Sequence, residues 1–131
     1  MSIIQTIDQG IATRLGHYAD AVVIPAGFDQ VLVSATPGID QDGDIPDDIT
    51  LQSEQAWENV TRVLEAAGAS VDDIVYTRQW LTRESDIGEY LAVRTRYLSH
   101  RPASSVTVVR ALERPEFLVA VEVIAARQVE D

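Results

Sequence analysis

The sequence predicts an α+β domain in which two helices pack on one face of a mixed sheet. Two long segments repeat apolar residues at helical spacing, and the segments around them are rich in β-branched residues between Gly, Pro and Asp clusters. The expected order is β-β-β-α-β-α-β-β, which gives a six-stranded sheet. Apolar runs such as VLV (31–33) and FLVAV (117–121) indicate strands covered on both sides. Two helices cover only one face, so self-association is expected to cover the other.

The first predicted helix lies in residues 51–67, with Thr50 as its N-cap and Gly68 as its stop. Its apolar face is formed by residues at three- and four-residue steps, namely Leu51, Trp57, Val60, Leu64 and Ala67. The second predicted helix follows Ser85 as N-cap and ends before Pro102. Its stripe consists of Ile87, Tyr90, Leu91, Arg94, Tyr97 and Leu98, and so it contains one charge.

The predicted strands cover residues 19–26, 29–36, 71–81, 104–111 and 116–126, with a weaker strand near the N-terminus. Trp57 and Trp80 are expected in the core. The acidic segment 38–48 is interpreted as a solvated loop, because it lacks the terminal Glu of a calcium-binding loop.

Length and composition favour a single domain over residues 1–131. The chain has no cysteine, which excludes disulfides and thiolate chemistry, and His17 and His100 are too few for a His-rich metal site. No signal peptide or membrane span is evident, so a cytoplasmic location is expected. The net charge of −11 argues against nucleic acid and anionic membranes as partners. No phosphate-binding or dinucleotide-binding glycine motif is present, and no cofactor or metal is expected.

Several segments together resemble the Rid family of enamine/imine deaminases, over roughly residues 15–126. They are HYADAV, QVLVSATPGID, NVTRVLEAAGASVDDIVYTRQWLT, YLAVRTRYL, RPASSVTVV and VAVEVIAA. The resemblance implies a chorismate-mutase-like fold and a homotrimer with three small-molecule sites in the clefts between subunits. It also implies hydrolysis of 2-enamino and 2-imino acids to 2-oxo acids and ammonia.

The family's deaminases hold the substrate carboxylate with an arginine in a P-A-R-S segment, supported by an Asn on the second helix and a Glu on the last strand. In this chain the three positions fall on Ser104, Leu91 and Ala120. Loss of a bidentate Arg–carboxylate pair weakens binding by about 2–5 kcal/mol, on the order of a hundredfold or more. Ordinary 2-imino acid deaminase activity is therefore expected to be weak.

Three retained residues are candidates for the site. Tyr18 matches a family tyrosine and can pass a proton, or it simply packs its ring at a strand entrance. Ser34 matches a family serine, or its hydroxyl is bonded within a turn. Glu122 is a candidate general base, or it pairs with a cation across the trimer interface.

Two arginines are candidates for that cation, or for the missing guanidinium. Arg94 interrupts the stripe of the second helix, where family members often have an aromatic residue. Arg78 shares a strand face with Trp80. The alternatives are a side chain that snorkels at the edge of the stripe for Arg94 and a rim charge over an aromatic ring for Arg78.

Two hypotheses follow. In the first, the chain is a divergent Rid trimer that transforms a small imine, enamine or related carbonyl metabolite without the usual recognition of an α-carboxylate. Tyr18, Glu122 and a water molecule would move protons, and Ser104 would enlarge the pocket. In the second, it is a trimer without catalytic activity that binds a metabolite or a protein.

Overall fold

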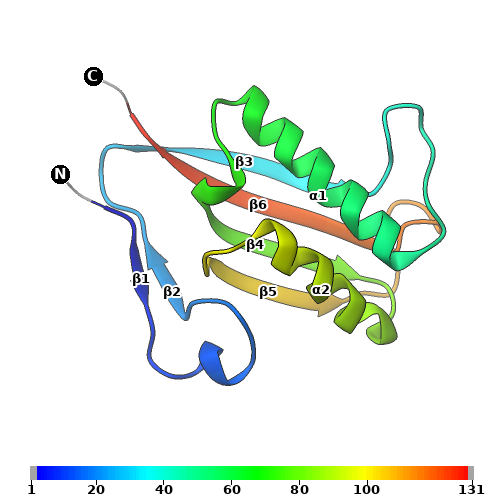
Figure 1. Cartoon of the computed structure of the whole chain (residues 1–131), viewed down its shortest axis with the longest axis horizontal. Helices are drawn as coiled ribbons and strands as arrows, with labels where there is room; N and C mark the ends of the chain where they lie inside the picture. Colours follow the sequence, from blue (N-terminus) through cyan, green and yellow to red (C-terminus); the bar gives the residue numbers. More distant parts are fainter. Residues whose placement is uncertain (1–2, 130–131) are drawn as a thin grey trace.

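The computed structural model describes residues 3–129, and it confirms the α+β class. Short 3-10 turns cover residues 12–14, 71–73 and 84–86. The strands are β1 Gln5–Ile7, β2 Ala21–Val23, β3 Phe28–Pro37, β4 Ile74–Leu81, β5 Ala103–Val108 and β6 Val119–Gln128. The helices are α1 Ile49–Ala66 and α2 Ile87–Tyr97, and both lie on the same face of the sheet (Figure 1).

The main sheet has four strands in the order β3-β6-β4-β5, so the six-stranded prediction is wrong. Only the β4–β5 pair is parallel. β1 and β2 form a separate antiparallel pair that meets the sheet through a single bridge between Ala19 and Ala103. The chain leaves β2 through Pro25, which has no N–H for a ladder, and Gly27 at φ 96° turns it into β3. β2 is therefore too short to extend the sheet.

The helix boundaries follow their caps. Asp48 caps α1, because its carboxylate accepts the N–H of Leu51 at 2.9 Å, so the N-cap prediction of Thr50 is wrong by two residues. Gly68 has φ 76° and ends the helix as predicted. α2 follows a 3-10 turn that contains the predicted cap Ser85, and the structure places the cap at Asp86 instead.

The core lies between the helices and the sheet. Its largest members are fully buried, and they include Trp57, Leu64, Tyr90, Val119 and Val121. Two predicted core positions differ: Leu51 is 54% exposed on α1, and Trp80 is only half-buried because it points to the other face of β4.

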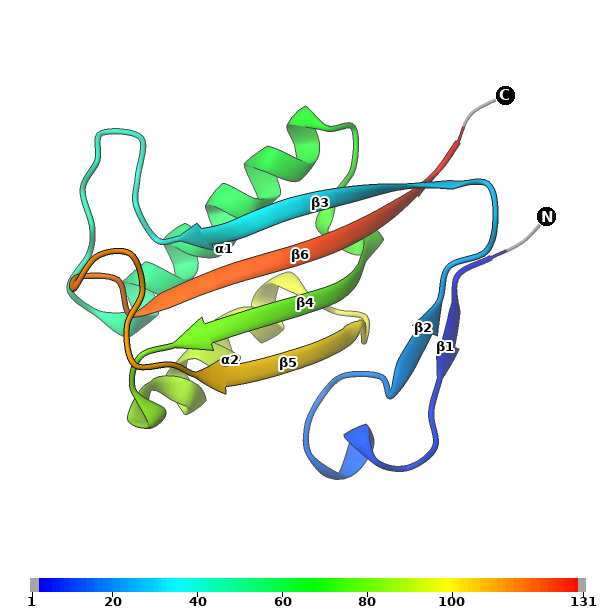
Figure 2. The same cartoon turned by 180° about the vertical axis from the view of Figure 1, so that it is seen from behind.

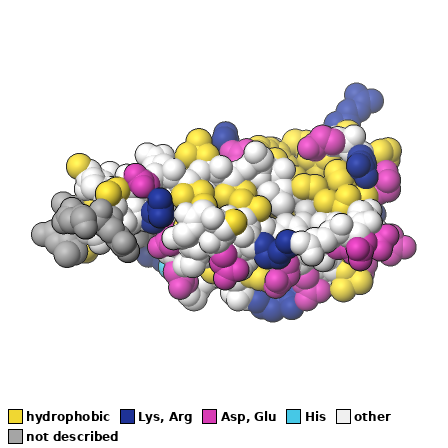
Figure 3. All heavy atoms as spheres, turned by 90° about the horizontal axis from the view of Figure 1, so that it is seen from above, with side chains coloured by type: hydrophobic (Ala, Val, Ile, Leu, Met, Phe, Trp, Pro, Cys, Tyr) yellow, Lys and Arg dark blue, Asp and Glu magenta, His cyan; other side chains and the backbone are white. Residues whose placement is uncertain are grey.

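The face of the sheet opposite the helices is uncovered in the chain (Figure 2). We call it the open face. Leu32 on β3 is 71% exposed there, beside its cross-strand partner Ile124. Seen from above, acidic side chains are spread over the surface among apolar ones (Figure 3). No helix within residues 3–129 is both long enough and apolar enough to cross a bilayer.

The acidic loop is exposed, and it is organised by its own first carboxylate. Asp40 Oδ1 accepts the N–H groups of Asp42 and Asp44 at 2.9 and 2.8 Å. The three carboxylates lie within 4.8 Å of one another. These bonds explain the turn without a metal ion.

Candidate functional site

A pocket of about 200 Å³ lies between α2, the edge strand β5 and the segment that precedes β2. We call it the β5-edge pocket. Its lining residues are Leu15, Gly16, Tyr18, Leu91, Arg94, Ser104, Ser105 and Val106. Four predicted site residues, Tyr18, Leu91, Arg94 and Ser104, thus meet in one place. They come from three segments that are far apart in the sequence.

Arg94 places a buried guanidinium in this pocket. The residue is 7% exposed, and its Nη1 donates to Gln79 Oε1 at 3.1 Å and to Ser104 Oγ at 3.3 Å. Its Nε and Nη2 have no partner within residues 3–129, and neither atom is sealed from solvent. Arg94 also forms no salt bridge in the described chain. Burial lowers the pKa of Arg94, although a guanidinium remains protonated in proteins.

The position of Arg94 shows which cation lies beside Ser104. The sequence places a serine where the family's arginine is expected, and the structure brings a guanidinium to that serine from α2. The cation beside Ser104 therefore comes from α2 and not from β5. Arg94 fits in the apolar stripe of α2 because its aliphatic carbons pack there while its guanidinium reaches β5.

Tyr18 forms part of the pocket wall on a segment that is held by polar contacts. The carboxylate of Asp20 accepts the N–H groups of Gln9 at 2.6 Å and Ala12 at 2.7 Å, and these bonds lower the pKa of Asp20. Arg101 binds Asp8 with two hydrogen bonds of 2.8 and 2.6 Å, and its Nη1 donates to the Tyr18 carbonyl at 3.3 Å. These contacts fix the wall against the start of β5.

The remaining predicted residues lie on the open face, on the other side of the sheet. Ser34, Arg78 and Glu122 line a hollow of about 270 Å³. Arg78 Nε donates to Glu122 Oε2 at 2.8 Å, so the cation that pairs with Glu122 is Arg78 of the same chain. Ala120 is 2% exposed and pairs with Trp80. Within one chain, the sheet separates Glu122 from Tyr18.

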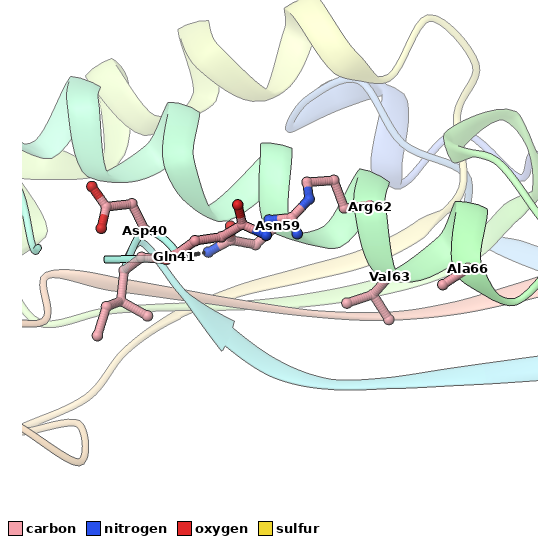
Figure 4. A pocket seen from close by; sticks show the side chains of 7 residues that line it. Asp40, Gln41, Asn59, Arg62, Val63 and Ala66 are labelled. Atoms are coloured by element: carbon pink, nitrogen blue, oxygen red, sulfur yellow. Dashed lines mark hydrogen bonds between the residues drawn. The ribbon is translucent and has the colours of Figure 1, made fainter. Parts of the chain in front are cut away.

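A third hollow, of about 390 Å³, lies between α1 and the loop that follows β3 (Figure 4). Asn59 is its central polar group, and its Nδ2 donates to the carbonyls of Ile39 at 2.7 Å and Pro37 at 3.0 Å. Its Oδ1 accepts from Gln55 at 2.9 Å. The amide is used in holding the loop, so the β5-edge pocket is the better candidate for a site.

Sequence reasoning missed Gln79, which is fully buried on β4 and contacts both Arg94 and Ser104. Its only signal is a long amide side chain in a strand whose other inward residues are small or apolar. Its partners are 15 and 25 residues away, so no local motif reveals them.

Comparison with known proteins agrees with this fold. The sequence profile described as endoribonuclease L-PSP matches residues 11–127. The 2-iminobutanoate/2-iminopropanoate deaminase of Escherichia coli K12 is 32% identical over 90 residues, which cover 66% of this chain and 70% of that protein. A RutC family protein of Saccharolobus solfataricus is 33% identical over 76 residues, and this match spans only 58% of this chain and 60% of that protein.

Among solved structures, a Rid family protein of unknown function from Yersinia pestis superposes with a TM-score of 0.82. It covers 95% of this chain and 98% of its own, and its 22% identity supports the fold alone. The profile match extends over most of the chain and includes every lining residue of the β5-edge pocket. The chain therefore belongs to the endoribonuclease L-PSP family, the family of the Rid proteins.

Proposed function

We propose that the chain hydrolyses a small imine or enamine that carries a carboxylate, and that the β5-edge pocket is its active site. The observation that carries this proposal is the guanidinium of Arg94, which is buried without an acidic partner in the described chain. A buried charge without a partner is destabilising, so such a site favours a ligand that supplies the opposite charge. The 32% identical deaminase relative supports the reaction class.

The size and lining of the pocket favour a short molecule. At about 200 Å³ it is smaller than the roughly 300–1,000 Å³ of drug-sized pockets. Leu15, Leu91 and Val106 provide apolar wall, while Arg94 provides the charge. A carboxylate on Arg94 with a short aliphatic tail on the apolar side fits this arrangement.

The reaction needs a water molecule and a route for protons. Water adds to the carbon of the protonated imine, a proton moves from the new hydroxyl to nitrogen, and the C–N bond breaks to give a carbonyl and ammonium. Tyr18 is the one lining residue with a phenol group, and we assign it the role of passing protons in this cycle. Arg94 is assigned to the carboxylate, and the hydroxyl of Ser104 lies beside it.

A second candidate function is binding without turnover. It is favoured by one observation: none of the eight residues that line the pocket is a carboxylate or a histidine. Proton transfer would then depend on Tyr18, on water and on whatever a second copy of the chain contributes. On this alternative the same ligands bind, but none is converted.

We further propose a homotrimer that packs through the open face. Leu32 at 71% exposure and the half-buried Tyr76 and Trp80 are apolar groups that an assembly would cover. The Arg78–Glu122 pair lies among them, and we assign it to packing. We expect Glu122→Gln to lower the melting temperature or the trimer fraction in sedimentation, with kcat/KM within about threefold of the parent. A loss of about a hundredfold in kcat with intact assembly would instead assign Glu122 to catalysis.

The activity test generates short 2-imino acids with an amino-acid oxidase or a threonine dehydratase and measures how much the protein accelerates their decay. We expect acceleration by the parent chain and its loss in Arg94→Met. Arg96→Met is the matched control, because Arg96 lies on the same helix, is exposed and pairs with Glu54 at 2.8 Å. Equal decay with and without the parent protein would refute the enzymatic proposal. Binding of the product 2-oxo acid in that case would support the alternative.

A further inference from the structure

Below the β5-edge pocket lies a closed network of side chains centred on Gln79. Gln79 and Tyr90 are both 0% exposed. The Tyr90 hydroxyl donates to Gln79 Oε1 at 2.6 Å, and Arg94 Nη1 donates to the same oxygen at 3.1 Å. Gln79 Nε2 donates to Ser104 Oγ and to the Ser105 carbonyl, both at 3.0 Å. The amide thus makes four hydrogen bonds, which is its full capacity.

The orientation of this amide is set by its neighbours. A backbone carbonyl can only accept a hydrogen bond, so the group of Gln79 that faces Ser105 must be the NH₂. Its carbonyl oxygen must then face Tyr90 and Arg94. Arg94 has no acceptor role, and so the same orientation satisfies both ends of the amide. The network therefore has one consistent arrangement of donors and acceptors.

In this arrangement Arg94 and Ser104 can offer the pocket only donors. Ser104 Oγ accepts from Gln79 Nε2 and from Arg94 Nη1, which uses both of its lone pairs, so its own proton points away from them. Ser104 and Arg94 both line the pocket, and the Nε and Nη2 of Arg94 are not sealed from solvent. A set of N–H and O–H donors around one positive charge is suited to an anion.

The amide of Gln79 also determines how much of the positive charge of Arg94 is left uncancelled. Gln79 is fully buried, accepts a hydrogen bond from Arg94 and is neutral. A carboxylate at this position would form a buried ion pair with Arg94 and cancel its charge. Because an amide fills the place, the guanidinium is held by good hydrogen bonds but keeps its full charge for the pocket.

We propose that Gln79 is the positioning and specificity-determining residue of the β5-edge pocket: its neutral, oriented amide fixes Arg94 and Ser104 as donors and preserves the charge that selects a carboxylate ligand. Gln79 touches no ligand itself. It acts through Arg94 and Ser104. The proposal rests on the proposed function for the identity of the ligand, but it concerns binding and charge selection, which can be measured without turnover.

The experiment compares how tightly each protein binds pyruvate, a short 2-oxo acid, and its neutral amide, pyruvamide, by calorimetry. The parent chain is expected to prefer the acid. Gln79→Glu is expected to weaken binding of the acid at least thirtyfold, since loss of an available charge costs about 2 kcal/mol, and to leave binding of the amide nearly unchanged. A general structural defect would weaken both ligands alike, so the ratio of the two affinities isolates the role of charge.

A second pair of variants keeps the test open in case Gln79→Glu folds poorly, since its second oxygen would face the Ser105 carbonyl. Ser104→Asp places a carboxylate beside Arg94 at the half-buried pocket wall, and Ser104→Asn is its neutral counterpart of the same shape. We expect the ratio of acid to amide affinity to be at least thirtyfold lower in Ser104→Asp than in Ser104→Asn, since the two variants share a shape and differ in charge. Arg96→Gln serves as the surface control and should match the parent.

The outcomes separate the two proposals. If the parent binds the acid selectively and Gln79→Glu and Ser104→Asp lose that selectivity, the inference is supported, whether or not any imine is hydrolysed. If Gln79→Glu folds and binds the acid as tightly as the parent, the inference is overturned, even if the parent proves to be a deaminase. If Gln79→Glu does not fold, the same result for Ser104→Asp overturns the inference. If the parent shows no preference for acid over amide, the inference is likewise overturned.

Discussion

Arg94 is expected to reduce the stability of the fold while it enables ligand binding, and Arg94→Met separates these effects. The residue is 7% exposed and has no acidic partner in the described chain, and burial lowers its pKa. Its removal leaves no acceptor without a donor, because Gln79 Oε1 still receives the Tyr90 hydroxyl and Ser104 Oγ still receives Gln79 Nε2. Met fills similar space with an apolar chain.

The expected gain in the free energy of unfolding is about 1–2 kcal/mol, the lower part of the range seen when buried ionic groups are replaced by apolar ones. For a domain of this length, that raises the melting temperature by roughly 3–8 °C. The assay is thermal unfolding followed by circular dichroism, with and without a short 2-oxo acid. A ligand at a hundred times its Kd adds about 2.7 kcal/mol to the parent, so the order of the two melting temperatures should reverse when ligand is present.

The control is Arg96→Met, which removes an exposed ion pair and should change stability by less than about 1 kcal/mol. A clear drop in the melting temperature of Arg94→Met, with Arg96→Met unchanged, would refute the reasoning. It would mean that the guanidinium already has adequate compensation within the fold.

Three further predictions concern other parts of the chain. Tyr18→Phe should lower kcat about a hundredfold with KM little changed, since only the hydroxyl is lost, and steady-state kinetics of imine decay checks this. Gly38→Ala should destabilise the fold by about 2–3 kcal/mol in urea unfolding, because a Cβ there would overlap the backbone carbonyl of Gln52. Gly43→Ala is less suitable as a control, since the φ of Gly43 is 88°. Gly88→Ala is the matched control, because nothing lies near its added Cβ, and it should be neutral or stabilising. The lowered pKa of Asp20 means that its stabilising effect is present above the ordinary value of 3.8 and is lost as pH falls through the lower folded value. Hydrogen exchange of residues 8–18 should therefore rise below that pH in the parent, and Asp20→Asn should remove the dependence.

The fold was predictable where local patterns decide it. Helical periodicity located α1 and α2, and Gly68 ended α1 as expected because its φ of 76° is one that glycine adopts readily. The pairing of β1 with β2 was not predictable, since it depends on where the chain turns after Val23 and on what the edge of β5 can accept. Trp80 was placed in the core because aromatic residues are usually buried, but the direction of its strand face decides its exposure.

The candidate site was predictable only in part. Tyr18, Leu91, Arg94 and Ser104 were singled out individually, but the sequence left open whether Arg94 or Arg78 stands near Ser104. Only the three-dimensional arrangement shows that Arg94 reaches the serine while Arg78 is held by Glu122. Gln79 carries no signal in the sequence beyond a long amide in an inward strand position, because its partners lie on other elements.

The guanidinium that α2 brings to Ser104 has a consequence for which substitutions this site tolerates. Ser104→Arg would bring a second guanidinium against Arg94, and the oxygen of Gln79 has no lone pair left for it, because that oxygen already accepts from Tyr90 and Arg94. Like charges at this distance repel each other, so the substitution should be harmful here. We therefore expect positions 79, 94 and 104 to be coupled, so that a change of charge at one of them is tolerated only when another changes with it.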